Sequence, residues 1–516
     1  MQSDLINFRS GDGSNARQSL GQQPAVDPYI LPVMFGMLEI RDAAIRGNAF
    51  KFVLISRRSR HRAGTRYFSR GMDENGNVSN YNETEQSVIL NDSSSGPFGG
   101  YGGGDFTNGK VRESWGTEVQ VLSYVQTRGS VPVFWGEMNT LHYTPKLQIR
   151  GVDSAVRAAR QHFDQQIKLY GDNHLVNLVN QKGRERGVKE AYERIVRILV
   201  SSPNEGSIAD ERTDEKFHVV EPMGKDARLD RLHYTYFDFH NETKGLRWYR
   251  AQLLLDQLND ALLTQGYFHG VDMPGYSPSK VDIKRLQTSV VRTNCMDCLD
   301  RTNVIQSMLG RWTLSRMLQN LGILRDGESS QDDPAFESLF RNVWADNADV
   351  VSKSYSGTGA LKTDFTRTGD RTRMGMFQDF RNSITRYVLN NFQDGPRQDA
   401  FDLFLGTYVP STSSSAGAAP IFVDRRPPFI QAVPYVLAAC TFFIALATMT
   451  TRLPDSNVWP LRLLVMMSFV AAGWCLHFIW THGTLYVSCA KRSLLASALI
   501  LLLRFLFSSH GMLNTR

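Results

Sequence analysis

Short apolar runs separated by turn-forming residues occupy the first third of the chain and indicate a β-rich region. The expected strands are Tyr29–Phe35, Phe52–Ile55, Val88–Leu90, Val119–Val125 and Val131–Trp135. Residues 1–27 are instead rich in serine, glycine and glutamine, which predicts a disordered tail. We therefore expect a β-rich lobe over residues 28–150.

A glycine-rich stretch, residues 91–110, interrupts this β pattern. Glycines of this kind can cradle the phosphates of a nucleotide. Here, however, no G-x-G-x-x-G register is followed by a helix, so we predict a surface insertion instead.

After Val152 the apolar period becomes helical. Amphipathic helices are expected at Ala155–Leu169, Val188–Leu199 and Leu246–Leu263, with short strands at Leu175–Val179 and Tyr234–Phe239. Alternation of helices and strands favours an α/β domain, which we place at residues 151–406. We predict a linker at residues 407–428, because the start of this segment is rich in Ser, Pro and Ala.

Two long apolar runs follow the linker and predict a transmembrane hairpin over residues 429–480. Phe429–Met449 carries no charged residue and would be about 30 Å long as a helix, the thickness of a bilayer core. Leu463–Trp480 is a second such run. Beyond it, residues 481–516 form a tail in which Leu494–Phe507 is too short to span and is expected to be interfacial.

Positive charges flank the hairpin and suggest its orientation. Arg425 and Arg426 precede the first run, and Lys491 and Arg492 follow the second. By the positive-inside rule, both ends and the large polar region are expected in the cytosol.

The net charge and the cysteine content limit the classes of protein to which the chain can belong. The 516 residues include 58 Lys and Arg against 51 Asp and Glu, a net charge of +7, which suits anionic partners such as phosphate esters or a membrane surface. Five cysteines are too few for a disulfide-stapled secreted scaffold.

The candidate chemistry lies in a segment that reads as strand, loop and helix. Ser289–Thr293 is a β-like run, and an apolar stripe at helical spacing begins at Val304. Between them the sequence contains C-x5-R-T, formed by Cys295, Arg301 and Thr302.

This arrangement suits hydrolysis of a phosphate ester without a metal or cofactor. Loop N–H groups at a helix N-terminus bind anions and lower a thiol pKa, so Cys295 can attack phosphorus as a thiolate. Arg301 can bind the phosphoryl oxygens with a planar fork, and Thr302 can donate to the departing sulfur. The backbone expected to line the phosphate belongs to Met296, Cys298, Leu299 and Asp300.

Two carboxylates within the loop need a role that does not repel phosphate. A protonated Asp297 would be a suitable general acid for the leaving oxygen, with Asp300 or another residue as alternatives. Asp300 could instead form an ion pair that orients Arg301.

Cys295 and Cys298 also form a C-x-x-C pair. A zinc site would need two further ligands, and the remaining cysteines, Cys440, Cys475 and Cys489, lie in or beside the hairpin. A reversible disulfide that protects the nucleophile remains an alternative.

Other charged segments allow both structural and functional interpretations. Six arginines occur between Arg57 and Arg70, and a structural role paired with acids such as Glu83 and Glu85 is favoured over a lipid-facing patch. Lys362 and Arg367 could line the phosphate pocket or be solvated in a loop.

The segment around Cys295 resembles the signature of the Sac-domain phosphoinositide phosphatases, and is most similar to the membrane-anchored Sac1 type. Further segments are similar to that family in the same order: 56–67, 82–86, 126–132, 237–240, 344–347 and 357–369. The resemblance implies hydrolysis of phosphatidylinositol phosphates, chiefly the 4-phosphate and also the 3-phosphate. It also implies residence in the endoplasmic reticulum and Golgi, with Cys295 as nucleophile and Arg301 as phosphate binder.

The chain departs from the family pattern at both ends. The N-terminal lobe is shortened, so the strands from Tyr29 to Trp135 are expected to form an incomplete sheet with an exposed edge, and the C-terminal tail is atypical. Two other functions remain open: a dual-specificity protein phosphatase, which shares the thiolate chemistry, and an inactive phosphoinositide-binding membrane adaptor. No nucleic-acid partner is expected.

Overall fold

A computed structural model of the chain describes residues 33–91, 119–200, 227–244, 248–273, 280–369, 372–406, 426–449 and 459–488. They belong to two compact units. The first draws on residues 1–63, 69–136 and 149–384, and the second on residues 64–68, 137–148 and 385–516. The expected N-terminal tail, the glycine-rich insertion, most of the linker and the tail after residue 488 lie outside the described residues.

The first unit is built on a nine-stranded mixed sheet. Its strands are β1 (Val33–Ile45), β2 (Asn48–Ser59), β3 (Asn82–Leu90), β4 (Gln120–Arg128), β7 (Asp172–Asn177), β8 (Leu232–Tyr236), β9 (Phe268–Met273), β10 (Lys280–Arg285) and β11 (Ser289–Asn294). β5 (Trp135–Met138) and β6 (Lys146–Ile149) form a separate two-stranded sheet.

Helices surround the large sheet and continue into the second unit. They are α3 (Val152–Tyr170), α4 (Arg186–Val200), α5 (Phe239–Glu242), α6 (Gln252–Gln265), α7 (Asp300–Asn320), α8 (Pro334–Ser356), α9 (Thr363–Thr368), α10 (Arg373–Phe392), α11 (Asp394–Phe404), α12 (Pro428–Met449) and α13 (Trp459–Thr481).

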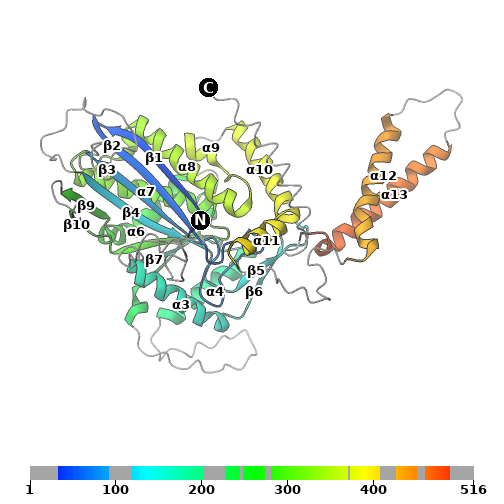
Figure 1. The fold of residues 1–516 in the computed structure, drawn as a ribbon, viewed down its shortest axis with the longest axis horizontal. Coiled ribbons are helices and arrows are strands. Elements are labelled where there is room, and N and C mark those ends of the chain that lie inside the picture. The colour runs from blue at the N-terminus through cyan, green and yellow to red at the C-terminus, as the bar shows by residue number, and fades with distance from the viewer. Residues whose placement is uncertain are drawn as a thin grey trace, which may run out of the picture. The chain divides into compact units, whose positions relative to one another are not determined.

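The strand order joins the β-rich region to the α/β region. The order is β1-β2-β3-β4-β11-β7-β8, with β9 also paired to β4 and β10 paired to β9. β1 to β4 form an antiparallel meander, whereas β4, β11, β7 and β8 run parallel. The sheet therefore contains strands from both sides of residue 150 (Figure 1).

Aromatic side chains hold α8 against the sheet. The Phe52 ring of β2 lies 5.8 Å from Phe336 and 5.7 Å from Phe340, and Phe340 lies 6.1 Å from Trp344. All four are almost completely buried. Rings packed in tilted or edge-on geometry stabilise such a core beyond simple area burial. The neighbour of β2 on its other side, β1, is an edge strand, and its Leu38 is 65% exposed.

Most expected elements of the first unit are confirmed, and three strand predictions are wrong in part. The expected strand Leu175–Val179 ends at Asn177. Of the run Val131–Trp135, only Trp135 is in a strand, because Pro132 has no N–H for a ladder and the Val133 N–H bonds to the Val131 carbonyl in a tight turn. The run Tyr234–Phe239 stops at Tyr236, since the Asp238 side chain caps α5 by accepting from the Asn241 N–H.

The second unit contains two helices long and apolar enough to cross a membrane. α12 has a mean hydropathy of 2.0 and α13 of 1.9, and most of their side chains are not buried in the protein. They pack against each other through aromatic rings, with Phe429 5.9 Å from Trp474 and 5.7 Å from Phe478. Their positions agree with the two runs expected from sequence.

Candidate active site

The candidate site lies where the central strand β11 ends. All six residues of β11 are buried, and its parallel neighbours are β4 and β7. Residues 295–299 leave the strand as a short loop, and α7 begins at Asp300. The carboxyl edge of parallel strands is the usual position of ligand sites in α/β proteins, because the loops leave the sheet there.

The sulfur of Cys295 accepts two hydrogen bonds. The Cys298 N–H donates at 3.0 Å and the Thr302 hydroxyl at 3.4 Å. The residue is only 2% exposed, and its burial acts to raise the thiol pKa. The hydrogen bond with Cys298, the charge of Arg301 and the Thr302 hydroxyl together outweigh burial, and they lower the pKa of Cys295 to about 6.

Cys298 has the opposite character. Its thiol donates to the Gly129 carbonyl at 2.9 Å and lies 3.3 Å from the Cys295 carbonyl oxygen. Burial and the neighbouring Cys295 raise its pKa, so Cys298 stays protonated while Cys295 ionises. Its backbone has a φ of 52°, a left-handed conformation that costs a non-glycine residue about 1–2 kcal/mol.

The Arg301 guanidinium is held along one edge. Its Nη1 and Nη2 donate to the two carboxylate oxygens of Glu185, each at 2.9 Å. Nη1 also donates to the Leu178 carbonyl at 3.0 Å and to Asn180 Oδ1 at 2.9 Å. Within the described ranges, no acceptor contacts Nε, so the edge formed by Nε and Nη2 can bind a second anion bidentately.

Asp297 is tied to the β2–β3 connection. Arg70 Nη1 donates to its carboxylate, and the Asn80 side chain donates to its backbone carbonyl at 3.1 Å. Only 2% of the Arg70 side chain is exposed, against 21% for Asp297. The Asp297 carboxylate is thus bound by an almost completely buried guanidinium.

The remaining predicted residues have distinct positions. Asp300 accepts from the Leu361 N–H at 2.8 Å, which ties the start of α7 to the segment before α9. The carboxylate that pairs with Arg301 is therefore that of Glu185 and not that of Asp300. Met296 and Leu299 are buried. Lys362 is exposed and follows this segment directly.

Arg367 is bound by side chains of α8. Its Nη2 donates to Asp346 at 2.7 Å and lies 3.6 Å from Asp349, while Nη1 donates to Asn342 at 3.0 Å. Two of these partners are carboxylates of α8, so they neutralise the guanidinium. Among the arginines between 57 and 70, the structural interpretation is confirmed for Arg57, which pairs with Glu83 and Glu85.

Sequence reasoning missed three residues that shape this site. The sequence did not mark Glu185 as a site residue, because it lies in a polar segment more than a hundred positions before the C-x5-R-T motif. Arg128 and Arg292 are completely buried beneath the loop, where Arg128 donates to Asn303 and Arg292 donates to the Ser130 carbonyl. Burial lowers the pKa of Arg128 to about 10, although Cys298 and Cys295 act in the opposite direction.

Comparison with known proteins identifies the family. A family model described as the SacI homology domain matches residues 3–244. The chain is also 41% identical over 471 residues to an uncharacterised protein of Schizosaccharomyces pombe, a match that covers 91% of this chain and 68% of that protein. The chain therefore belongs to the SacI homology domain family, as its motifs suggest.

Two named relatives make the resemblance more specific. Phosphatidylinositol-3-phosphatase SAC1 of Saccharomyces cerevisiae is 44% identical over 420 residues, which cover 81% of this chain and 58% of that protein. Phosphatidylinositol-3-phosphatase SAC1-A of Danio rerio is 37% identical over 450 residues, with 86% and 66% covered. The chain thus spans about three fifths to two thirds of the length of these relatives.

Proposed function

We propose that the protein is a phosphoinositide phosphatase that uses Cys295 as its nucleophile. The observation that carries this proposal is the asymmetric cysteine pair: the Cys295 sulfur accepts two hydrogen bonds and has a lowered pKa, whereas Cys298 stays protonated. A family whose named members are phosphatidylinositol phosphatases supports the choice of substrate. Phosphatidylinositol 4-phosphate is the proposed principal substrate, and the 3-phosphate a second one.

In the first step, the Cys295 thiolate attacks phosphorus. An S–P bond forms, the bond from phosphorus to the inositol oxygen breaks, and that oxygen takes a proton. The free edge of Arg301 binds two phosphoryl oxygens and stabilises their charge in the transition state. Asp297 is the proposed proton donor, which requires that it first releases Arg70 and becomes protonated.

In the second step, water hydrolyses the cysteinyl-phosphate. The water oxygen attacks phosphorus, its proton passes to the Asp297 carboxylate, and the S–P bond breaks. The Thr302 hydroxyl, 3.4 Å from the sulfur, stabilises the departing thiolate. Phosphatidylinositol and inorganic phosphate are the products.

Turnover also requires the loop to move. Cys295 is 2% exposed, and the Cys298 N–H donates to the sulfur instead of to a phosphate. The left-handed conformation of Cys298 stores strain that its relaxation would release. A shift of residues 296–299 would expose the sulfur and turn backbone N–H groups toward the substrate.

The apolar helices provide the proposed link to the membrane. We propose that α12 and α13 anchor the chain in the endoplasmic reticulum and Golgi, with the sheet-containing unit in the cytosol. Tethering would keep the site near lipid headgroups and raise their effective concentration.

The deciding experiment is phosphate release from vesicles that contain one monophosphorylated phosphatidylinositol, the 3-, 4- or 5-phosphate, with EDTA present. The full chain should release phosphate, Cys295→Ser should release none, and Cys440→Ser, which changes a cysteine of α12, should match the unmodified chain. If lipid binds without phosphate release, the protein is an adaptor. If phosphopeptides are hydrolysed in preference to lipids, it is a protein phosphatase.

A further inference from the structure

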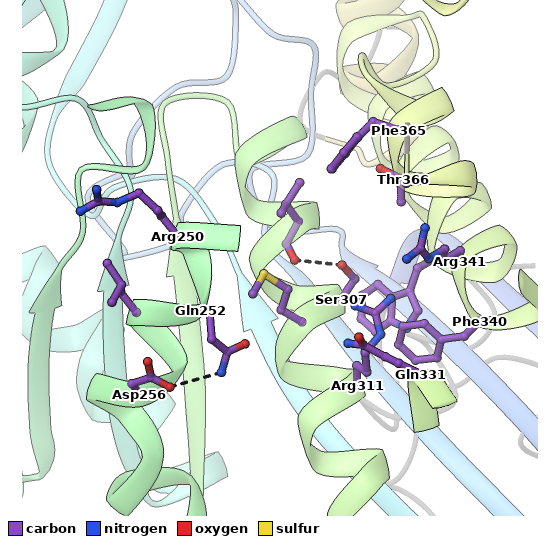
Figure 2. A pocket seen from close by; sticks show the side chains of 15 residues that line it. Arg250, Gln252, Asp256, Ser307, Arg311, Gln331, Phe340, Arg341, Phe365 and Thr366 are labelled. Carbon is purple, nitrogen blue, oxygen red and sulfur yellow. Dashed lines mark hydrogen bonds between the residues drawn. The ribbon is translucent and has the colours of Figure 1, made fainter. Parts of the chain in front are cut away.

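A cavity lies along α7, the helix that follows the loop of residues 295–299. Its volume is about 770 Å³, a size typical of small-molecule sites. It is bounded by α6 and the turn before it, by one face of α7, and by α8 and α9 (Figure 2). None of residues 295–302 lines it. We call it the α7 cavity; its principal lining residues are Arg250, Arg311, Arg341, Met308, Phe340 and Phe365.

One wall of the α7 cavity carries excess positive charge. Arg311 Nη2 and Arg341 Nε both donate to the same oxygen of Glu337, at 2.9 Å for Arg311. Two guanidinium groups thus share one carboxylate, and Figure 2 shows them together beside Phe340. The pKa of Arg311 is lowered, first by burial and also by the charge of Arg341, although Glu337 opposes the shift. A further anion here would balance the charge.

Polar atoms around the cavity also lack partners. The Nε atoms of Arg250 and Arg311 are buried and have no hydrogen-bond partner in the described part of the chain, and the same holds for Glu337 Oε2. Buried donors without acceptors are rare and costly in folded proteins. A ligand that brings acceptor oxygens would satisfy the arginine donors.

The other lining residues limit the ligand. Met308 and Phe365, which are half-buried, offer apolar surface beside the arginines, whereas the buried Phe340 ring lies under the Arg311 guanidinium at 4.9 Å. Opposite them, Asp256 lies on α6 and accepts from Gln252 at 3.3 Å (Figure 2). A second negative group near Asp256 would be repelled, so the site favours one anionic group on an apolar body over a polyanion.

We propose that the α7 cavity binds an amphipathic anion, a molecule with one phosphate or carboxylate group and an apolar body. Arg311 and Arg341 hold the anionic group. Met308 and Phe365 contact the apolar body. Both a lipid and a soluble ester have this chemistry.

Calorimetric titration of hexylphosphonate into the full chain, held in nanodiscs of neutral phosphatidylcholine, tests the proposal. We expect saturable binding that weakens at least tenfold in Arg311→Gln and in Arg341→Gln. Arg316→Gln, an exposed arginine of the same helix, is the matched control and should bind normally. Asp256→Asn should bind at least as tightly as the unmodified chain, and it serves as a second variant if an arginine change prevents folding.

Two controls separate this site from the active site. Hexylphosphonate should still bind to Cys295→Ser and Arg301→Lys, whereas binding lost only in those two variants would place the ligand at the loop and overturn the proposal. Inorganic phosphate that binds as tightly as hexylphosphonate would overturn it too, since the apolar body would contribute nothing. Displacement of hexylphosphonate by phosphatidic acid in the nanodisc would identify a lipid source, and its absence a soluble one.

Discussion

Glu185 and Arg301 form a two-point ion pair, with both guanidinium Nη atoms 2.9 Å from separate carboxylate oxygens. The pair occupies one edge of the guanidinium and leaves the Nε edge for substrate. In the proposed mechanism Glu185 is therefore a positioning residue, because it holds Arg301 without competing for the edge proposed to bind phosphate.

Glu185→Gln should lower kcat/KM by about 10- to 100-fold, because hydrogen bonds to charged groups contribute ~1.5–3 kcal/mol and the amide keeps only part of the contact. Steady-state hydrolysis of phosphatidylinositol 4-phosphate measures the loss. Glu190→Gln, whose carboxylate pairs with the exposed Arg186, should have no effect. An unchanged or higher kcat/KM in Glu185→Gln would mean that the ion pair restrains Arg301 instead of positioning it.

The thiolate of Cys295 predicts the acidic limb of the pH profile. The thiol pKa is lowered to about 6, so the reactive form is lost as pH falls through that value, and kcat/KM should rise with pH and level off near neutrality. Thr302→Val removes one hydrogen bond to the sulfur and should move this limb to higher pH. Thr313→Val, a buried threonine of the same helix, should leave it in place. A limb that does not move would exclude the Thr302 contact as a cause of the lowered pKa.

Asp297 can be tested by varying the leaving group. If Asp297 protonates the inositol oxygen, Asp297→Asn should slow lipid hydrolysis by about 10²-fold or more and hardly affect an aryl phosphate whose leaving group needs no proton. The comparison of kcat for both substrates is the measurement. Equal losses would show that Asp297 serves only to anchor the loop through Arg70.

Gly310 of α7 should not tolerate a methyl group. A Cβ there would lie 2.8 Å from the Trp344 ring and 2.9 Å from Gln86 Oε1. Gly→Ala normally stabilises a helix by ~1 kcal/mol, but overpacking here should destabilise the fold by about 1–3 kcal/mol. Thermal unfolding should therefore show a lower midpoint. The midpoint of Gly136→Ala, where a Cβ would meet no heavy atom within 4 Å, should change little; a stabilised Gly310→Ala would contradict the packing described for α7.

If α12 and α13 anchor the chain as proposed, the full chain should stay in the membrane fraction after alkaline carbonate extraction. Val470→Arg, which puts a charge in the middle of α13, should weaken retention, since a central arginine costs ~2.5–3.5 kcal/mol on insertion. Thr481→Arg at the helix end should be tolerated, because its side chain can reach the interface. Complete release of the unmodified chain would exclude a spanning hairpin.

Helices and strands whose formation depends on neighbouring residues in the sequence could be predicted from the sequence alone. β11 and α7 were predictable because a buried apolar run is followed by an apolar stripe at helical spacing. The two apolar helices were equally predictable. The roles of Cys295, Arg301 and Thr302, and the substrate class suggested by the resemblance to a known family, stay predictions.

Contacts between distant segments were not predictable. Glu185 reaches Arg301, and Arg70 reaches Asp297, only because the sheet and its connections bring them together. The position of Arg367 in the phosphate pocket stays a prediction, and its pairing with Asp346 could not be predicted because it depends on the packing of α9 against α8. Pro132 did contain a usable signal, since a residue without an N–H weakens any prediction of an interior strand.

The position of β11 also bears on how the protein is made. Its two neighbours, β4 and β7, leave the ribosome long before residue 289, so the strand that delivers the nucleophile inserts last between partners already synthesised. Until β11 is made, the edges of β4 and β7 that pair with it have no partner. Unpaired strand edges of this kind can pair with other chains. The loop that follows β11 therefore cannot form until more than half of the sequence has been synthesised, and chaperone dependence during translation should be concentrated in the interval before β11 is made.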